Sequence, residues 1–264
     1  MRILFLGDIV ARLGRETTGK VLPKLLKTAK ISLVFANAEN IAHGKGATTA
    51  TIEEVRGYGV DYYTSGNHIF WRSEILEGLD GSDLPVLRPA NYDEDVPGRG
   101  WTVIDTGKQG KVLLINLQGR ILIQDDVSCP FRTVDRILKE QSNEDFSAII
   151  VDMHAEVTSE KVALGWYLDG RVSAVVGTHT HVPTSDTWVM PKGTAYVTDI
   201  GMIGAQYSVL GVKPEIIIPF MKYPMPQRFE WVEEGPAVFN SVLLDIDRRS
   251  GKAKSIKRLD KIVD

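Results

Sequence analysis

Short apolar segments that each end in polar side chains recur along this chain, and they constrain its fold more than any other feature. Residues 175–182 read VVGTHTHV, an apolar run that ends in His179 and His181, two of only five histidines in the chain. The other segments of this form end at Asp8, at Glu39 and Asn40, at Asn67 and His68, and at His154. Because ligands of α/β sheets bind outside the carboxyl ends of the strands, we expect these side chains to meet at one edge.

Helical patterns separate the apolar segments in the first third of the chain. Apolar residues at helical spacing around Val21 to Leu26 predict a helix, with Pro23 in an early turn or at a kink. A shorter helix over 51–59 is ended by glycine. The strands of this part are expected at 2–8, 31–40 and 60–68.

The remainder of the chain is expected to add strands on both sides of two helices. A hairpin over 101–119 should turn at 107–110, and a helix should lead into a strand over 147–154. The helix expected at 159–170 is followed by a strand at 172–181. The last third reads as mostly strand at 194–201, 228–235 and 239–247, while 213–223 is ambiguous between helix and strand. No repeat or linker interrupts the pattern, which predicts one α/β domain over residues 1–264.

Composition and charge exclude several classes of protein. Net charge is −3, which argues against strong general binding to nucleic-acid backbones. A single cysteine, Cys129, permits no intrachain disulfide, and no apolar stretch approaches the ~20 residues of a membrane helix. The apolar start is interrupted by Asp8 and is too short for a secretory signal. We therefore expect a cytoplasmic protein that does not bind membranes.

Each polar residue at a strand end has an ordinary structural explanation when taken alone. Asp8 could cap a helix, residues 66–68 could form a turn, and His154 could be a hydrogen-bonded core histidine. Together they form a set of nitrogen and oxygen ligands without a thiolate, which favours iron, manganese or zinc over calcium. The set is too large for one ion, and it suits two metals that share a bridging carboxylate. His43, in a glycine-rich loop, is expected at the surface or the rim of the site, and its role is open.

The ordered motifs GD, EN, GNH, H and GTHTH resemble those of the calcineurin-like metallophosphoesterases. Three positions depart from the general pattern: Val10 replaces a histidine, Glu39 with Asn40 replaces an aspartate region, and Ile69 replaces an acidic residue. These departures resemble one bacterial subfamily, the YmdB-type phosphodiesterases. The blocks NAENIAHGKG, INLQGR, HAEVTSEKVALGWYLDGRVSAVVGTHTHVPT and KGTAYVTDIGM carry the likeness along nearly the whole chain.

The resemblance implies a role for each residue, which the spacing alone leaves open. It implies a two-sheet sandwich flanked by helices, with the metals at the carboxyl ends of strands and His68 as the general acid. The first metal would be held by Asp8, Glu39, Asn40 and His181, and the second by Glu39, Asn67, His154 and His179.

The activity implied is hydrolysis of 2',3'- or 3',5'-cyclic nucleotides, or of related small phosphodiesters, by a hydroxide that bridges two divalent metals. Iron or manganese is expected, with zinc as a further option, and a homo-oligomer is possible. One alternative is a phosphomonoesterase, such as a protein phosphatase or nucleotidase, with Arg120 and Arg171 supplying extra positive charge. Another is a metal-binding regulatory protein whose hydrolysis is incidental. The natural substrate is open.

Overall fold

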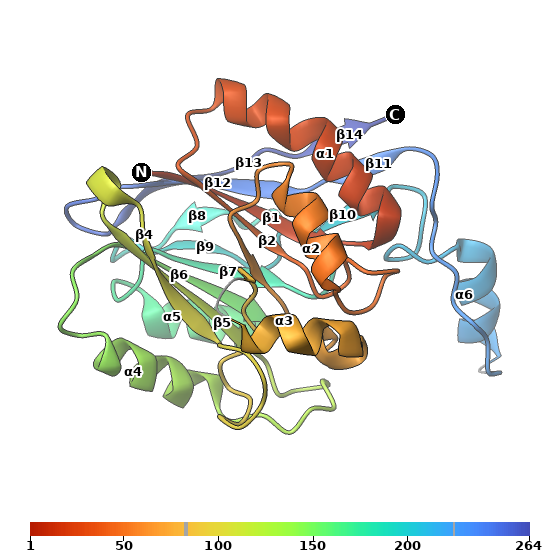
Figure 1. Cartoon of the computed structure of the whole chain (residues 1–264), viewed down its shortest axis with the longest axis horizontal. Coiled ribbons are helices and arrows are strands. Elements are labelled where there is room, and N and C mark those ends of the chain that lie inside the picture. Colours follow the sequence, from red (N-terminus) through yellow and green to blue (C-terminus); the bar gives the residue numbers. More distant parts are fainter. Residues whose placement is uncertain (82–83, 224) are drawn as a thin grey trace.

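Two β-sheets stacked against each other form the centre of the computed structural model, which describes residues 1–81, 84–223 and 225–264 (Figure 1). The first sheet contains β1 (Arg2–Ile9), β2 (Leu33–Asn37), β3 (Tyr62–Thr64), β10 (Met202–Ala205), β11 (Ala237–Phe239), β12 (Ser241–Ile246), β13 (Ala253–Arg258) and β14 (Lys261–Val263). The second sheet contains β4 (Trp101–Asp105), β5 (Lys111–Gln118), β6 (Phe146–His154), β7 (Ala174–Thr178), β8 (Trp188–Val189) and β9 (Ala195–Val197).

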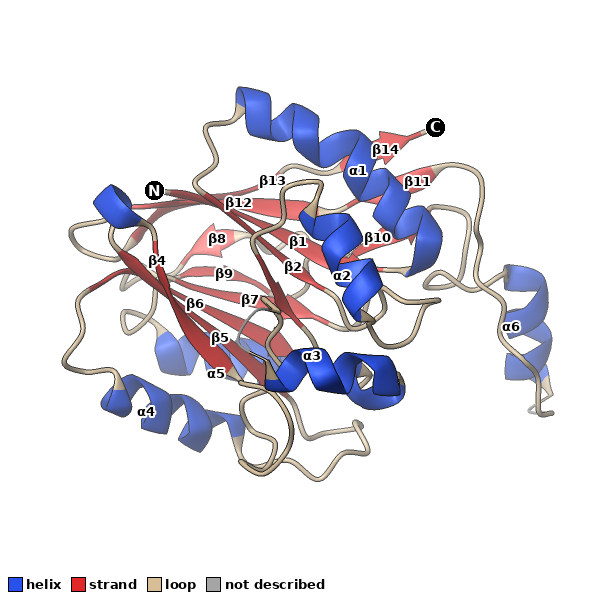
Figure 2. Ribbon diagram, viewed as in Figure 1, coloured by secondary structure: helices blue, strands red, loops and turns tan. Residues whose placement is uncertain are grey.

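Helices cover the outer faces of both sheets (Figure 2). The α-helices of the described residues are α1 (Ala11–Thr28), α2 (Thr49–Arg56), α3 (Leu76–Asp80), α4 (Pro130–Glu140), α5 (Thr158–Leu168) and α6 (Pro214–Lys222), and the 3₁₀ turns are η1 (Ile69–Trp71), η2 (Ser73–Ile75) and η3 (Gly107–Gln109). Helices α1 and α2 lie on the first sheet, and α4 and α5 lie on the second. No helix among the described residues is both long and apolar enough to cross a membrane.

Strand β1 is apolar on both faces because both faces are covered. Leu4 and Leu6 belong to the core beneath α1 and α2, whereas Ile3 and Phe5 belong to the core between the two sheets. Alternate side chains of a strand point to opposite faces, so a strand between two layers must be apolar throughout. The unbroken apolar run of β1, up to Asp8, follows from this position.

Parallel pairing brings the carboxyl ends of the central strands to one edge. In the second sheet, Gln118 of β5 pairs with His154 of β6, which pairs with Thr178 of β7. In the first sheet, Asp8 of β1 is aligned with Asn37 at the end of β2. The polar residues that follow these strands therefore emerge on the same side of the molecule, as the sequence predicted.

The α/β fold with two sheets and flanking helices is confirmed, and several segments differ from expectation. The hairpin of β4 and β5 turns through η3 as predicted. The strand expected over 228–235 is wrong: only an isolated bridge joins Trp231 to Val212 there. Residues 214–222 form a helix with Pro219 inside it, and Pro23 lies within α1. A single domain over residues 1–264 stays a prediction.

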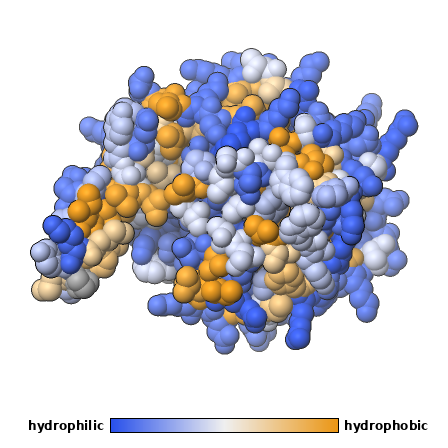
Figure 3. All heavy atoms as spheres, turned by 180° about the vertical axis from the view of Figure 1, so that it is seen from behind, coloured by the Kyte–Doolittle hydropathy of each residue, from blue (hydrophilic) through white to orange (hydrophobic). Residues whose placement is uncertain are grey.

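Helix α6 projects from the body as an arm with apolar side chains on its surface (Figure 3). Ile218, Met221, Tyr223 and Met225 are all exposed along or just after it, whereas Ile217 is buried. The segment from 225 to 230 then returns from the arm toward the body without regular secondary structure (Figure 1).

Candidate metal centre

The chain folds its predicted ligands into one buried cluster where the two sheets meet at their carboxyl edges. Asp8 and Glu39 are almost completely buried, and His154, the last residue of β6, is fully buried. His179 and His181 lie beyond the end of β7, in a short loop rather than in the strand itself. The strand expected over 172–181 is therefore shorter than predicted and ends at Thr178.

Two groups of ligand atoms share Glu39. One consists of Glu39, His154 and His179, and the other of Asp8, Glu39 and His181; within each group the ligand atoms lie within 4.8 Å of one another. His154 Nε2 is 3.0 Å from Glu39 Oε2 and 2.9 Å from His179 Nδ1. A carboxylate that belongs to two adjacent groups can bridge two cations, so the geometry suits the pair of ions that the sequence suggested.

Two oxygens in this region have no hydrogen-bond partner among the described residues. They are Asp8 Oδ1 and Asn67 Oδ1, and both atoms are buried. Buried polar atoms in folded proteins are nearly always paired, since an unpaired one costs free energy. A cation beside each oxygen would supply the missing partner, so the residues present fit bound metal ions.

Glu39 and His154 set each other's ionisation in the cluster. Burial would raise the pKa of the Glu39 carboxyl, but the charge and hydrogen bond of His154 outweigh burial and hold that pKa well below its ordinary value. Burial would lower the pKa of His154, but Glu39 raises it to about 9. Burial, followed by the charge of His154, lowers the pKa of His179 to about 3. Glu39 is thus ionised and requires a cation beside it, a place that a proton on His154 fills when no metal is bound.

A polar layer behind the cluster orients His154. Its Nδ1 lies 2.9 Å from Thr178 Oγ1, which in turn donates to Asp152 Oδ1 at 2.8 Å. This arrangement leaves Nε2 of His154 facing Glu39. Metal-binding histidines typically have such a partner on the second ring nitrogen, because it fixes the ring and the tautomer.

The loop that carries His179 and His181 has an uncommon backbone held by a buried ion pair. Both histidines have positive φ, 97° at His179 and 64° at His181. Between them, Thr180 donates to Asp199 Oδ2 from its backbone nitrogen at 3.1 Å and from its hydroxyl at 2.7 Å. The same oxygen accepts from Lys161 Nζ at 2.7 Å, and both charged side chains are fully buried. A left-handed backbone at non-glycine residues persists only where its surroundings enforce it, and Asp199 does so here.

Gly66 leaves room for the cluster. A Cβ atom at this position would lie 2.1 Å from His154 Nε2 and 2.4 Å from Glu39 Oε2. Such contacts are impossible for real side chains, so the chain in front of Asn67 must be glycine for the ligands to approach one another.

Asn40 and His68 form the open side of the centre. His68 Nδ1 lies 2.9 Å from Asn40 Oδ1, and the backbone nitrogen of His68 donates to Glu39 Oε2 at 3.3 Å. Asn40 Nδ2 lies 3.0 Å from His181 Nε2. A cation bound beside His181 would require the Asn40 side chain to present its oxygen, not its nitrogen, on that side. A half-turn of the Asn40 amide group exchanges Oδ1 and Nδ2. His68 remains partly exposed, with 19% of its side chain accessible.

Comparison with known proteins places this site in a family. A family model described as YmdB-like protein matches residues 4–259. The chain belongs to the YmdB-like family. It is 45% identical over 263 residues to a 2',3'-cyclic-nucleotide 2'-phosphodiesterase of Bacillus subtilis (strain 168), an alignment that covers 98% of this chain and 96% of that protein.

Two solved structures have the same fold as this YmdB-like chain. One is a hypothetical protein from Thermus thermophilus, with a TM-score of 0.93, 38% identity and full coverage of both chains. The other is described as a novel phosphatase of Mycoplasma pneumoniae, with a TM-score of 0.92 and 32% identity over 99% of this chain and 93% of that one. The resemblance stated from the motifs is confirmed.

The residues that support the ligands of this YmdB-like protein were missed by the sequence analysis. None of these residues belongs to a metal-binding motif: Asp152 lies near the end of β6, Asp199 follows β9, and Lys161 lies in α5. Glu156 was also missed, although its Oε2 lies 3.1 Å from His179 Nε2. Arg171 was considered as a source of positive charge for a phosphate dianion. It instead pairs with Asp135 at 2.6 Å and lies before the start of β7, whereas the metal centre lies beyond the end of that strand.

Proposed function

We propose that this protein is a phosphodiesterase that binds two divalent metal ions and hydrolyses 2',3'-cyclic nucleotides. The single observation that carries the proposal is the sharing of Glu39 between two groups of ligand atoms, beside a partly exposed histidine. The name of the Bacillus subtilis relative supports the substrate class. Hydrolysis of 3',5'-cyclic nucleotides belongs to the same proposal and is tested with it.

The ligand assignment is part of this proposal. Glu39 would bridge the two ions, because it is the carboxylate common to both groups. Asp8 and His181, with the amide oxygen of Asn40, would complete the first site. His154, His179 and the amide oxygen of Asn67 would complete the second. Two cations held there would offset the negative charge of the phosphodiester and supply hydroxide near neutral pH.

His68 acts as the general acid in this proposal. Hydrolysis forms a bond from a water oxygen to phosphorus and breaks the bond to one ribose oxygen, which then needs a proton. For this step His68 would be the imidazolium, and its Nε2–H would pass the proton to that oxygen and leave a neutral imidazole. The Asn40 side chain, 2.9 Å from Nδ1, fixes the orientation of the ring. Asn67, one residue earlier, already contributes to the second site, and His68 is left free to face the leaving group.

The proposal is tested by measuring metal content and substrate preference together. Protein purified without chelator is expected to hold two equivalents of metal, iron or manganese with zinc as a further option. The imidazole, amide and carboxylate ligands suit all three metals. The protein should hydrolyse 2',3'-cyclic adenosine monophosphate and bis(p-nitrophenyl) phosphate, and 3',5'-cyclic adenosine monophosphate is assayed beside them. At most one equivalent of metal after reconstitution with either ion would reject the two-metal site.

The two alternatives make different predictions in the same assays. A phosphomonoesterase would prefer p-nitrophenyl phosphate to the diester, but the dianion needs extra positive charge. Arg171 lies away from the centre, which leaves Arg120, two residues after the end of β5, as the arginine that could supply it. A regulatory protein with incidental hydrolysis would keep its biological effect when His68 is replaced by alanine. Homo-oligomerisation is tested separately by sedimentation of the purified protein.

A further inference from the structure

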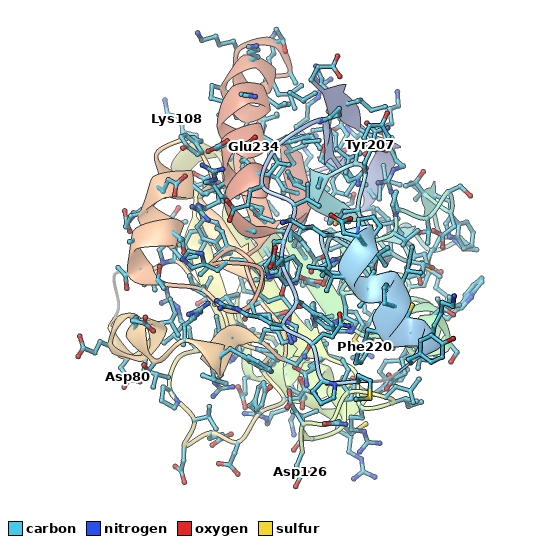
Figure 4. All side chains as sticks on the ribbon, turned by 90° about the vertical axis from the view of Figure 1, so that its right-hand side faces the viewer. Asp80, Lys108, Asp126, Tyr207, Phe220 and Glu234 are labelled. Carbon is cyan, nitrogen blue, oxygen red and sulfur yellow. The ribbon has the colours of Figure 1, made fainter. Side chains whose placement is uncertain are left out.

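An open groove lies beside the metal centre on the side of His68. It is lined by His43 and Lys45, by Trp71 of η1 with Arg72, by Tyr207, and by residues 213–215 and 227–234, and it has a volume of about 1560 Å³. Figure 4 views the side of the molecule that carries Tyr207 and Glu234, two lining residues, with α6 in front. The groove is larger than the roughly 300–1,000 Å³ of an ordinary small-molecule site, so it can hold more than the reacting phosphate.

Trp71 lines this groove and reaches the metal centre through His68. Its side chain is 60% exposed, which is high for so large an apolar group. The His68 and Trp71 ring centroids are 5.3 Å apart in an edge-to-face arrangement. Trp71 therefore presents an aromatic surface directly beside the proposed proton donor.

Positive charge accompanies this aromatic surface. Lys45 Nζ lies 4.2 Å from the centroid of the Trp71 ring, and Arg72 Nε donates to the backbone carbonyl of Lys45 at 3.3 Å. Proteins that bind single-stranded nucleic acids whatever the base commonly combine an aromatic side chain, on which a base stacks, with cationic side chains.

The position of the general acid determines where the nucleoside must lie. In a 2',3'-cyclic nucleotide both ester oxygens belong to one ribose, so the oxygen that takes the proton is attached to the sugar that carries the base. The base consequently lies within one ribose of His68. Trp71 is the exposed aromatic residue whose ring contacts His68.

We propose that Trp71 and Lys45 form a nucleoside-binding subsite, in which the base of a cyclic nucleotide stacks on the Trp71 indole. This inference rests on the proposed function and adds to it the part of the substrate that is not phosphate. Such a subsite would make the enzyme prefer phosphodiesters that carry an aromatic base to those that carry none. It would not distinguish strongly between one base and another.

The subsite is tested by comparing a cyclic nucleotide with a substrate that lacks the base. The variants are Trp71→Ala and Trp71→Phe, assayed with 2',3'-cyclic adenosine monophosphate and with 1-O-methylribose 2,3-cyclic phosphate. For Trp71→Ala the ratio of kcat/KM between the nucleotide and the base-free compound should fall by about 5- to 150-fold, mainly through KM. Trp71→Phe should retain most of the preference. Trp188→Ala, which removes another partly exposed indole, is the matched control and should keep the wild-type ratio.

Binding without turnover separates this inference from the proposed function. Adenosine 3'-monophosphate, titrated calorimetrically into the metal-loaded protein, should bind more weakly to Trp71→Ala than to wild type by a similar factor. If wild type binds this nucleotide through Trp71 but hydrolyses no cyclic nucleotide, the proposed function fails and the subsite stands. An unchanged substrate ratio, or equal binding by wild type and Trp71→Ala, would overturn the subsite.

Discussion

Glu39 carries more of the centre than any other residue, because it belongs to both groups of ligand atoms. Glu39→Ala is expected to reduce activity to background and to lose both metal equivalents, since each site loses its shared anion. Asn40→Ala removes one neutral ligand from one site and should leave measurable turnover. Metal analysis and initial rates on the two variants check this order, and a more damaging Asn40→Ala would show that the bridge is misassigned.

His68 is partly exposed, as His179 is, but it belongs to neither group of ligand atoms. His68→Ala should keep two metal equivalents and lose ~10²–10⁴-fold in turnover of cyclic nucleotides, the usual contribution of a general acid. The loss should be smaller for bis(p-nitrophenyl) phosphate, because nitrophenolate leaves without a proton. Equal losses on both substrates, or one missing metal equivalent, would make His68 a ligand or a structural residue.

The short loop that begins at His179, directly after β7, divides two ligands between two sites. In a continuous strand, residues 179 and 181 would point to the same face. Here the strand has already ended, both histidines have positive φ, and each joins a different group of ligand atoms. Asp199 holds this arrangement through the backbone and hydroxyl of Thr180.

Loosening that loop should weaken metal binding without touching a ligand. Thr180→Val keeps the shape of the side chain but removes the hydroxyl donor, and leaves the buried Asp199 with one hydrogen bond fewer. We expect metal affinity to fall by about tenfold or more, in the range seen for outer partners of metal ligands. Thr180→Ser restores the hydroxyl and should bind metal as wild type does. Competition with a chelator measures the metal affinity of both variants. Equal metal affinities of Thr180→Val and Thr180→Ser would show that the hydrogen bond from the Thr180 hydroxyl to Asp199 does not position the loop.

The strand ends were predictable because apolar runs and the polar groups that follow them are both visible in the sequence. The order of the residues was therefore sufficient to place Asp8, His154 and the GTHTH run together. The division of ligands between two sites came from the resemblance, because it depends on the backbone angles of His179 and His181. The segment around Trp231 was wrongly predicted as a strand. Its aromatic residue packs against Val10 and over Gly44, and a contact so distant in sequence has no local signal.

At the scale of the whole molecule, the two sheets share one apolar core. Phe5 of the first sheet and Leu114 and Val176 of the second belong to the same buried cluster. We expect the metal-free protein to unfold in one calorimetric transition with equal calorimetric and van't Hoff enthalpies, as a single domain should. Two separated transitions would contradict the single domain predicted for residues 1–264.

Metal ions should stabilise this whole unit, since their ligands come from both sheets. Free metal at 100 times its dissociation constant adds ~2.7 kcal/mol per site to the free energy of unfolding. For a chain of this size one site corresponds to a rise in Tm of roughly 5–10 °C. Scanning calorimetry before and after chelation measures the shift. An unchanged Tm would mean that the cluster is not a metal site.

The close approach of His154 and Glu39 to Gly66 has a consequence for sorting related sequences. A chain with every ligand and the acid in place, but with alanine at this position, would be counted as active by any search for metal-binding residue types. Its methyl group would nevertheless occupy the space that His154 and Glu39 need. A gene copy that carries Gly66→Ala would therefore encode an inactive protein although every ligand residue is present. Genome surveys of such proteins should inspect this glycine first.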